Sequence, residues 1–346
     1  MQTSKSLSRR NFIEKATVTA GLTALGTQTL FGKSNEFSPA QVSLPREVWI
    51  ATVSQEGMSA DTCENMVDQI LALLDKKTGH RPDVICLPEY VMVNRVRQRI
   101  RTLDERVNIS DELLKKFDNY ARANRCYMIV PAFIKEDGKI YNAAVVIDRN
   151  GNRMGEYRKM HLPEDEVQAG YAHGQLNPPV FKTDFGTIGI QICYDCNWHD
   201  GWKALQEQGA EIVFWPSAFP GGRMINAKAW DYKYIVVTST WGRSKICDIV
   251  GDEIAATGNW EKNYICVPVN LEQAFSTTWP YSRQFDEIIA KYGRKIKITA
   301  YHDENWAIFE SLSPDVRVND VLNEFNIKTA AQTLQDSELD EQKMRQ

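Results

Sequence analysis

Short apolar runs alternate along the chain with segments whose apolar residues recur at helical spacing. The β-rich run at 48–53 predicts a strand, and the run at 83–88 predicts a second, buried strand. Between them, Ser59 suits the N-cap of a helix because its hydroxyl can accept a backbone N–H. The apolar face of this predicted helix carries Cys63, Met66, Val67, Ile70, Leu71 and Leu74.

The same alternation continues to residue 269 and predicts a layered α/β fold. Ser110 is expected to open a second helix, and a strand is expected to begin near Asn152. The apolar face of that second helix carries Leu113, Leu114, Phe117 and Tyr120. Further strands are predicted at 126–134, 140–147, 180–181, 187–192, 212–215, 235–240, 245–249, 253–256 and 264–269, and helices at 198–208 and 224–234.

The first 40 residues have the pattern of an export signal. Arg9 and Arg10 form a twin-arginine motif, and a weakly apolar stretch rich in Ala, Gly and Thr follows at 16–31. That stretch is too short and too polar for a usual membrane span. We therefore expect residues 1–40 to be a twin-arginine signal peptide and linker, read by the Tat export machinery. The mature protein would then work in the periplasm or outside the cell.

Composition is that of an ordinary globular protein, with 43% hydrophobic and 25% charged residues. The formal net charge of -4 gives no electrostatic reason to expect a nucleic-acid partner. A local cluster of arginines is the exception and is interpreted as a solvated basic face. Its members are Arg95, Arg97, Arg99 and Arg101.

Three residues with complementary chemistry follow predicted strands. Glu89, Lys159 and Cys193 each lie near the carboxyl end of a strand, where loops gather and side chains can converge. A cysteine nucleophile benefits from a base that takes the thiol proton and from a cation that stabilises a tetrahedral intermediate. Glu89 and Lys159 could supply these two functions.

The spacing of Cys193 and Cys196 has other possible meanings. A zinc site normally needs four Cys or His ligands, and no second pair at matching spacing exists. A thioredoxin-like redox pair fits the local strand and helix but leaves Glu89 and Lys159 unexplained. A disulfide between the two cysteines would block the nucleophile, so we expect that Cys193 and Cys196 are not stably joined to each other in the active protein.

Three sequence blocks together resemble the nitrilase superfamily of carbon–nitrogen hydrolases. They are DVICLPEY at 83–90, YRKMHLPEDE at 157–166 and IGIQICYD at 188–195, and the resemblance extends over about residues 47–271. It implies an α/β four-layer α-β-β-α sandwich, a hydrolase domain at 41–271 and a homodimer or higher homo-oligomer. No metal or organic cofactor is implied.

The resemblance also assigns roles to individual residues. It implies Glu89 as general base, Lys159 as stabilising cation and Cys193 as nucleophile. Glu166 is implied as a second glutamate that positions the lysine or the substrate, because Gly170 and Gly174 then fall on the family's glycines. Glu164 is the alternative, and the backbone N–H of Tyr194 would complete the oxyanion site.

A Tyr-Asp pair after the nucleophile, here Tyr194 and Asp195, is commoner in the amidases and carbamoylases of this superfamily than in true nitrilases. The predicted reaction is therefore hydrolysis of a linear amide or N-carbamoyl group through a cysteine thioester, with nitrile hydrolysis as the alternative. A binding module with an idle site is the non-enzymatic alternative, and the presence of all the implied catalytic residues argues against it.

Several side chains are candidates for binding the substrate. Trp215 and Phe219 would supply aromatic surface, and Arg223 would bind a carboxylate. Packing in the core is the alternative interpretation of Trp215 and Trp241, and the one that we favour. The loop at 197–200 and the segment at 219–223 depart from the family pattern, so the substrate of a family member does not transfer to this chain.

The segment at 272–346 is expected to be a C-terminal extension that packs on the core or on a partner subunit. Phe285, Ile288 and Ile289 have helical spacing. The stretch at 332–346 is polar and acidic before a basic end, which suits a frayed helix or a tail.

Overall fold

The computed structural model describes residues 44–345 except 259 and 261. The twin-arginine motif at 8–15 and the whole predicted signal at 1–40 lie outside the described residues. Within the described part of the chain, no helix is long and apolar enough to span a membrane.

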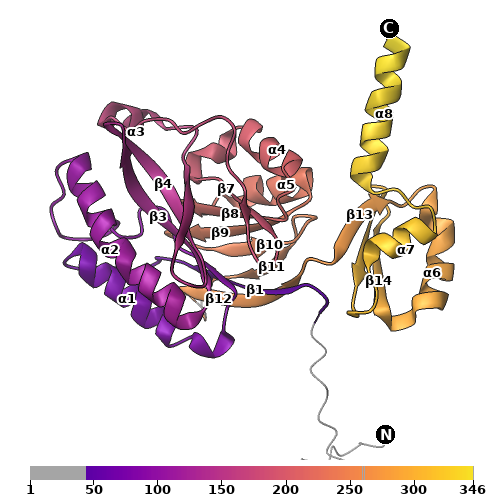
Figure 1. Cartoon of the computed structure of the whole chain (residues 1–346), viewed down its shortest axis with the longest axis horizontal. Coiled ribbons are helices and arrows are strands. Elements are labelled where there is room, and N and C mark those ends of the chain that lie inside the picture. Colours follow the sequence, from indigo (N-terminus) through magenta and orange to yellow (C-terminus); the bar gives the residue numbers. More distant parts are fainter. Residues whose placement is uncertain (1–43, 259, 261, 346) are drawn as a thin grey trace, which may run out of the picture. The chain divides into compact units, whose positions relative to one another are not determined.

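Two six-stranded sheets form the centre of the protein (Figure 1). The first has the order β12-β1-β2-β3-β4-β5, and the second has the order β11-β10-β9-β8-β7-β6. The strands of the first sheet, in that order, are Tyr264–Asn270, Glu47–Val53, Val84–Cys86, Tyr127–Glu136, Lys139–Ile147 and Arg153–Arg158. Those of the second are Glu253–Ala256, Lys245–Cys247, Ile235–Thr240, Ile212–Ser217, Thr187–Ile190 and Phe181–Lys182.

Parallel strands form the middle of each sheet. In the first sheet β1, β2 and β3 run parallel, and in the second β7, β8 and β9 do so. Their carboxyl ends open toward loops, which is where an α/β sheet places reactive groups.

Helices cover the outer face of each sheet, α1 and α2 on the first and α4 and α5 on the second (Figure 1). The bounds are Cys63–Asp75 for α1, Leu103–Asn124 for α2, Asp200–Glu207 for α4 and Gly222–Tyr232 for α5. Alternation along β1 explains the layering, because Ile50 packs between the sheets while Ala51 and Val53 pack under the helices. The predicted four-layer α-β-β-α sandwich is confirmed.

Two predicted helix starts were wrong. The first helix is capped by Thr62, whose hydroxyl accepts the N–H of Asn65 at 3.1 Å, and not by Ser59. The second begins at Leu103, where the Thr102 hydroxyl accepts the N–H of Glu105 at 3.1 Å. Val107 already belongs to the buried face of this helix, but the polar Ser110 that follows on the same face resembles a cap.

The remaining elements lie in connections between the strands and helices of the two sheets and in the C-terminal segment. Short helices there are α3 at Glu164–Ala169 and the 3-10 helices η2 at Thr78–His80, η3 at Cys193–Asn197, η4 at Tyr281–Gln284 and η5 at Gly293–Lys295. Residues 273–311 form a three-stranded antiparallel sheet of β13 (Gln273–Thr277), β15 (Trp306–Ser311) and β14 (Ile296–Tyr301). The last helices are α6 (Phe285–Tyr292), α7 (Val318–Glu324) and α8 (Ala330–Arg345). The helical spacing of Phe285 and Ile288 is confirmed, because both residues lie in α6 and both side chains are buried.

Candidate active site

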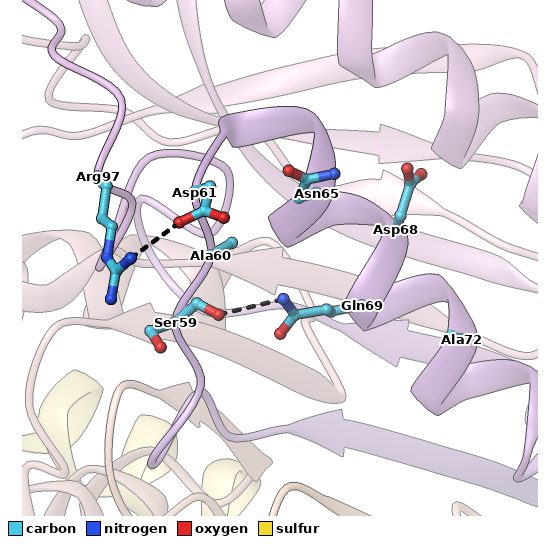
Figure 2. A pocket seen from close by; sticks show the side chains of 8 residues that line it. All are labelled: Ser59, Ala60, Asp61, Asn65, Asp68, Gln69, Ala72 and Arg97. Atoms are coloured by element: carbon cyan, nitrogen blue, oxygen red, sulfur yellow. Dashed lines mark hydrogen bonds and ion pairs between the residues drawn. The ribbon is translucent and has the colours of Figure 1, made fainter.

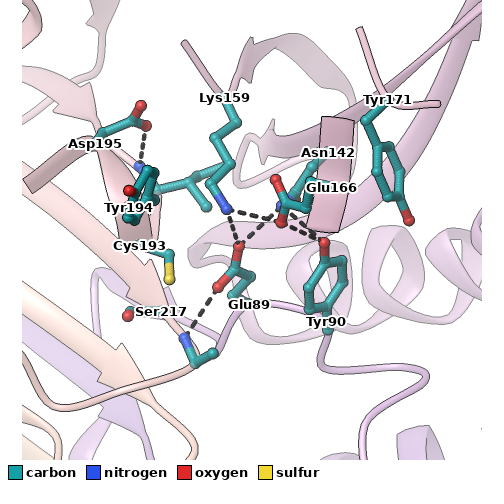
Figure 3. A network of polar contacts seen from close by, with 12 residues as sticks. Glu89, Tyr90, Asn142, Lys159, Glu166, Tyr171, Cys193, Tyr194, Asp195 and Ser217 are labelled. Atoms are coloured by element: carbon teal, nitrogen blue, oxygen red, sulfur yellow. Dashed lines mark hydrogen bonds and ion pairs between the residues drawn. The ribbon is translucent and has the colours of Figure 1, made fainter. Parts of the chain in front are cut away.

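Glu89, Lys159 and Cys193 come together from three different segments (Figure 3). Glu89 lies just beyond β2, Lys159 directly follows β5, and Cys193 opens η3 after β7. All three side chains are buried, although their exposed fractions differ, with 1% for Glu89 and Lys159 and 9% for Cys193. Because β2 and β5 belong to one sheet and β7 to the other, the site forms only where both sheets meet.

The ammonium of Lys159 lies between two carboxylates. Its Nζ donates to Glu89 Oε1 at 2.9 Å and to Glu166 Oε1 at 2.8 Å. Burial alone would lower the pKa of Lys159, but the neighbouring negative charges, with Glu89 foremost, raise it above its usual range. Lys159 is therefore a permanent cation. Glu164, the alternative second glutamate, is exposed and accepts a hydrogen bond from Gln168 instead.

Asn142 and Tyr90 complete this network. The Asn142 side chain, on β4, donates to Glu89 Oε1 at 2.8 Å and to Glu166 Oε1 at 3.1 Å. The hydroxyl of Tyr90 donates to Glu166 Oε1 at 2.5 Å. Glu166 Oε2, in contrast, is buried without a hydrogen-bond partner among the described residues.

The thiol of Cys193 is directed toward the carboxylate of Glu89 (Figure 3). Its backbone has φ +46°, a left-handed conformation that is uncommon for a side chain other than glycine and that costs energy at functional sites. Burial and then the charge of Glu89 raise the pKa of the thiol. Lys159 and hydrogen bonds from Ser217 and Ala218 oppose the rise without cancelling it. The Ala218 amide also donates to Glu89 Oε2 at 3.0 Å, so one backbone group orders base and thiol together.

Asp195 connects the turn that carries Cys193 to the segment that carries Lys159. Its carboxylate accepts from Tyr157 Oη at 2.7 Å and from the backbone N–H groups of Ile192 and His161, both at 2.8 Å. Burial raises the pKa of Asp195 to about 6, while these hydrogen bonds and the charge of Lys159 oppose the rise. Asp195 is thus a positioning residue for both sides of the site.

Two glycines shape the loop that brings Glu166 to the lysine. Gly170 ends α3 with φ +94°, and the Gly174 amide donates to Lys159 O at 2.8 Å. A Cβ on Gly174 would lie 2.1 Å from Arg158 O, which is far inside the contact distance. A side chain at Gly174 would therefore displace the backbone next to Lys159.

Cys193 and Cys196 are both free thiols and pack in different clusters. Cys193 belongs to the cluster between the two sheets, whereas Cys196 packs with Trp202 and Ile225 beneath α4 and α5. This division leaves one thiol at the charged network and the other in an apolar core.

The predicted substrate-binding side chains differ in burial, from wholly buried Trp215 to exposed Arg223. Trp215 is wholly buried, and its indole N–H donates to Cys193 O at 3.1 Å, so it packs against the backbone of Cys193 and does not line an open pocket. Phe219 is partly exposed and packs edge-on against Trp215. Tyr194 is also partly exposed and contacts Trp198 edge-on. Arg223 is exposed in the first turn of α5 and makes no hydrogen bond or ion pair with another described residue.

One cavity adjoins the catalytic network, and a second lies apart from it. The first, of about 310 Å³, is bordered by Glu166, Tyr90 and Trp241. The second, of about 630 Å³, lies against α1 and contains an ion pair between Arg97 and Asp61 at 3.3 Å (Figure 2). None of its lining residues contacts the catalytic network. Among residues 44–345 that are described, no group of three or more His, Cys, Asp or Glu side chains is arranged to hold a metal ion.

Sequence reasoning did not identify Asn142, Tyr90 and Tyr157 as parts of the site. Asn142 is a polar residue within a strand that is otherwise mostly apolar. A polar side chain in a buried strand needs hydrogen-bond partners, and this feature of the sequence could have indicated a role in the site. Tyr90 directly follows Glu89 in the first signature block, and Tyr157 opens the second block. Their hydrogen bonds depend on the meeting of distant segments, which one sequence does not reveal.

The family is shown by comparison with known proteins. The sequence profile of the carbon-nitrogen hydrolases matches residues 50–278, more than half of the 346 residues. The chain belongs to the carbon-nitrogen hydrolase family. The resemblance inferred from the three sequence blocks is confirmed at this level.

Relatives of the chain include proteins named for different substrates. Beta-ureidopropionase of Arabidopsis thaliana is 30% identical over 178 residues, which are 47% of this chain and 42% of that protein. Deaminated glutathione amidase of a Synechocystis strain is 39% identical over 93 residues, 24% of this chain and 34% of that protein. The chain therefore matches less than half the length of either relative.

Solved structures of the family share the fold. A carbon-nitrogen hydrolase from Helicobacter pylori G27 aligns with a TM-score of 0.59 at 17% identity and covers 66% of this chain and 90% of its own. At this identity the likeness concerns the fold alone.

Proposed function

We propose that this protein hydrolyses a non-peptide C–N bond of a linear amide or N-carbamoyl compound and releases ammonia or an amine. One observation carries the proposal. A buried carboxylate, Glu89, contacts the ammonium of Lys159 through one oxygen, and the Cys193 thiol is directed toward the same carboxylate. Base, cation and nucleophile therefore meet at one point, which is the arrangement that acyl transfer to a thiol requires.

The resting thiol is protonated in this arrangement. Because burial and the charge of Glu89 raise the pKa of Cys193, the thiolate is not the stable form at neutral pH. A base must then remove the proton as the nucleophile attacks, and Glu89 is the carboxylate placed to do so.

The proposed reaction has two stages. Glu89 takes the thiol proton while Cys193 Sγ bonds to the substrate carbonyl carbon, and negative charge develops on the carbonyl oxygen near Lys159 Nζ and the Tyr194 N–H. The C–N bond then breaks, and the leaving nitrogen takes the proton from Glu89. Water attacks the thioester as Glu89 removes its proton. The C–S bond then breaks, and the sulfur takes the proton back from Glu89, so the acid is released and both the thiol and the carboxylate are restored.

Glu166 is proposed to orient the substrate. Its Oε1 is fully engaged by Lys159, Asn142 and Tyr90, whereas Oε2 has no partner among the described residues. A buried carboxylate oxygen without a donor is costly, and an amide N–H of the substrate would satisfy it.

A panel of substrates tests the proposal. Linear amides, N-carbamoyl amino acids, N-carbamoyl amines and nitriles are assayed for ammonia release, with the Cys193→Ala protein as control. We expect amide or carbamoyl turnover that disappears in the variant while its circular dichroism and thermal unfolding stay unchanged. Nitrile turnover above amide turnover would replace the proposed reaction by the nitrilase alternative. An absence of turnover across the panel would favour a binding module.

Export and assembly complete the proposal. We propose that residues 1–40 direct the protein through the twin-arginine route and that the mature protein assembles as a homo-oligomer. A reporter fused to residues 1–45 would remain inside the cell when Arg9 and Arg10 are replaced by lysine, and unchanged export would contradict the signal. Light scattering of the purified protein measures its assembly.

A further inference from the structure

The cavity of about 310 Å³ beside the catalytic network has two arginines in its wall. It touches Glu166 directly, and it touches Trp241, whose indole N–H donates to Glu89 O at 2.6 Å. Its size is near the lower end of the range for small-molecule sites, which suits a group of a few heavy atoms. The lining residues are Tyr90, Val93, Asn94, Arg95, Arg106, Asp165, Glu166, Ala169, Tyr171 and Trp241.

Arg106 is held in place in this wall without a carboxylate partner. Its guanidinium lies 5.7 Å from the ring centre of Tyr90 and 5.4 Å from that of Phe133. Nη1 donates to the hydroxyl of Tyr171 at 2.7 Å. No described carboxylate forms an ion pair with Arg106, so most of its N–H donors stay available. The two neighbouring rings and the hydrogen bond to Tyr171 restrict the guanidinium, which lowers the entropy lost on binding a ligand.

The balance of charge in the wall favours an anion. Arg95 also lines the cavity without an ion pair to a described residue, and its backbone has φ +55°. Asp165 offsets one of the two positive charges. Lys159 contacts Glu166 Oε1 as well as Glu89, so it offsets only part of the negative charge of Glu166. Arg97, from the same arginine cluster, does not line this cavity. It forms an ion pair with Asp61 in the separate cavity at α1 instead.

We propose that this cavity binds a carboxylate of the substrate, with Arg106 as its principal ligand and Arg95 as a second cation. The inference rests on the proposed function and narrows it to linear amides or N-carbamoyl compounds that carry a carboxylate. Planar guanidinium and carboxylate groups match in a two-point contact, which fixes orientation as well as affinity. The reacting C–N bond lies at Cys193 and Glu166, and the carboxylate occupies the part of the cavity next to Arg106.

Succinamate and butyramide form the matched test pair, because they differ in having a carboxylate or a methyl group at the end of the same chain. We expect the Cys193→Ala protein to bind succinamate more tightly than butyramide in isothermal titration calorimetry. In the active protein, Arg106→Gln should lower kcat/KM for succinamate by about tenfold to a hundredfold, the range of a charge-assisted hydrogen bond, through KM. The same change should alter kcat/KM for butyramide by less than about twofold.

Two further variants separate binding from folding. Arg106→Lys keeps the charge but not the two-point geometry, and it should restore part of the succinamate affinity. Arg97→Gln is the matched control, because Arg97 is close to Arg95 in the chain but lies outside the cavity, and the change should leave both substrates unaffected.

Equal binding of succinamate and butyramide by the Cys193→Ala protein would overturn the carboxylate site. This test does not depend on any arginine variant. An equal loss for both substrates in Arg106→Gln would overturn it too, because it would indicate a structural role. These results are distinct from failure of the proposed function. In that case the active protein hydrolyses no amide, whereas the calorimetric preference for succinamate persists.

Discussion

Lys159 Nζ lies 2.9 Å from Glu89 Oε1, and both side chains are only 1% exposed. The same ammonium also contacts Glu166, so one buried cation faces two carboxylates and the trio carries a net negative charge. Burial and the charge of Glu89 raise the pKa of the neighbouring Cys193 thiol, whereas Lys159 opposes this rise. The contact between Lys159 and Glu89 thus brings together two charges that act on the pKa of the Cys193 thiol in opposite directions.

Replacement of Lys159 by methionine should destabilise the protein strongly. The change leaves two buried carboxylates without their cation, and removal of one partner of a buried ion pair costs about 3–5 kcal/mol. Urea unfolding followed by tryptophan fluorescence measures the effect. Lys135→Met is the control, because its ion pair with Asp104 is exposed and should cost less than about 1 kcal/mol. Equal effects of the two changes would contradict a stabilising role for the buried contact.

The thiol of Cys193 should titrate above the pH range of an ordinary cysteine. Burial and Glu89 raise its pKa, so the thiolate forms only as pH rises past the usual value near 8.5. The difference in thiolate absorbance between the protein and its Cys193→Ala variant reports this titration. Glu89→Gln removes the negative charge and should shift the titration toward lower pH while abolishing hydrolysis. An unshifted titration in Glu89→Gln would exclude Glu89 as a cause.

Asp195→Asn should lower kcat at least about tenfold while Cys193 and Lys159 remain present. The carboxylate accepts three hydrogen bonds that join the nucleophile turn to the segment of Lys159, and an amide cannot accept all three. Small misplacements of catalytic groups are costly to rate. Steady-state kinetics with the best amide substrate measure the effect. Wild-type kcat in the variant would show that the connection is not needed.

The same residue should give the protein a characteristic dependence of stability on pH. Burial raises the pKa of Asp195 to about 6 in the folded protein, above the usual value of about 3.9. Between these pH values the folded state binds more protons at this site, so its contribution to stability falls as pH rises from about 4 to about 6. We expect the stability of the wild type relative to Asp195→Asn to fall by on the order of 1–3 kcal/mol across this window. Urea unfolding at several pH values tests it, and a difference that rises with pH would give the wrong sign.

Gly174→Ala should impair both folding and turnover. The added methyl group would lie 2.1 Å from Arg158 O, and the backbone beside Lys159 would have to move. We expect a loss of stability of about 1–3 kcal/mol, as for other overpacked sites, and a lower kcat. Gly79→Ala is the control, because a Cβ there meets nothing within 4 Å. Thermal unfolding and amide kinetics of both variants compare the effects.

Much of the fold was predictable because its elements have strong local patterns. Buried strands such as β8 are continuous apolar runs, and α1 has a regular apolar stripe. The wrong start at Ser110 has a tertiary cause. Its hydroxyl accepts the N–H of Phe133 at 2.9 Å inside the protein, although a serine before an apolar stripe looks like a cap.

The sequence by itself determined the layered α/β class and the family, because these depend on local periodicity and on ordered blocks. It also predicted Glu89, Lys159, Glu166 and Cys193 as candidate site residues. Only the tertiary structure decided which groups surround them. Asn142 reaches two glutamates, Asp195 joins two segments, and Arg106 lines a cavity beside Glu166. Hydrogen bonds and burial depend on distances between segments that are far apart in the chain, and no local pattern encodes those distances.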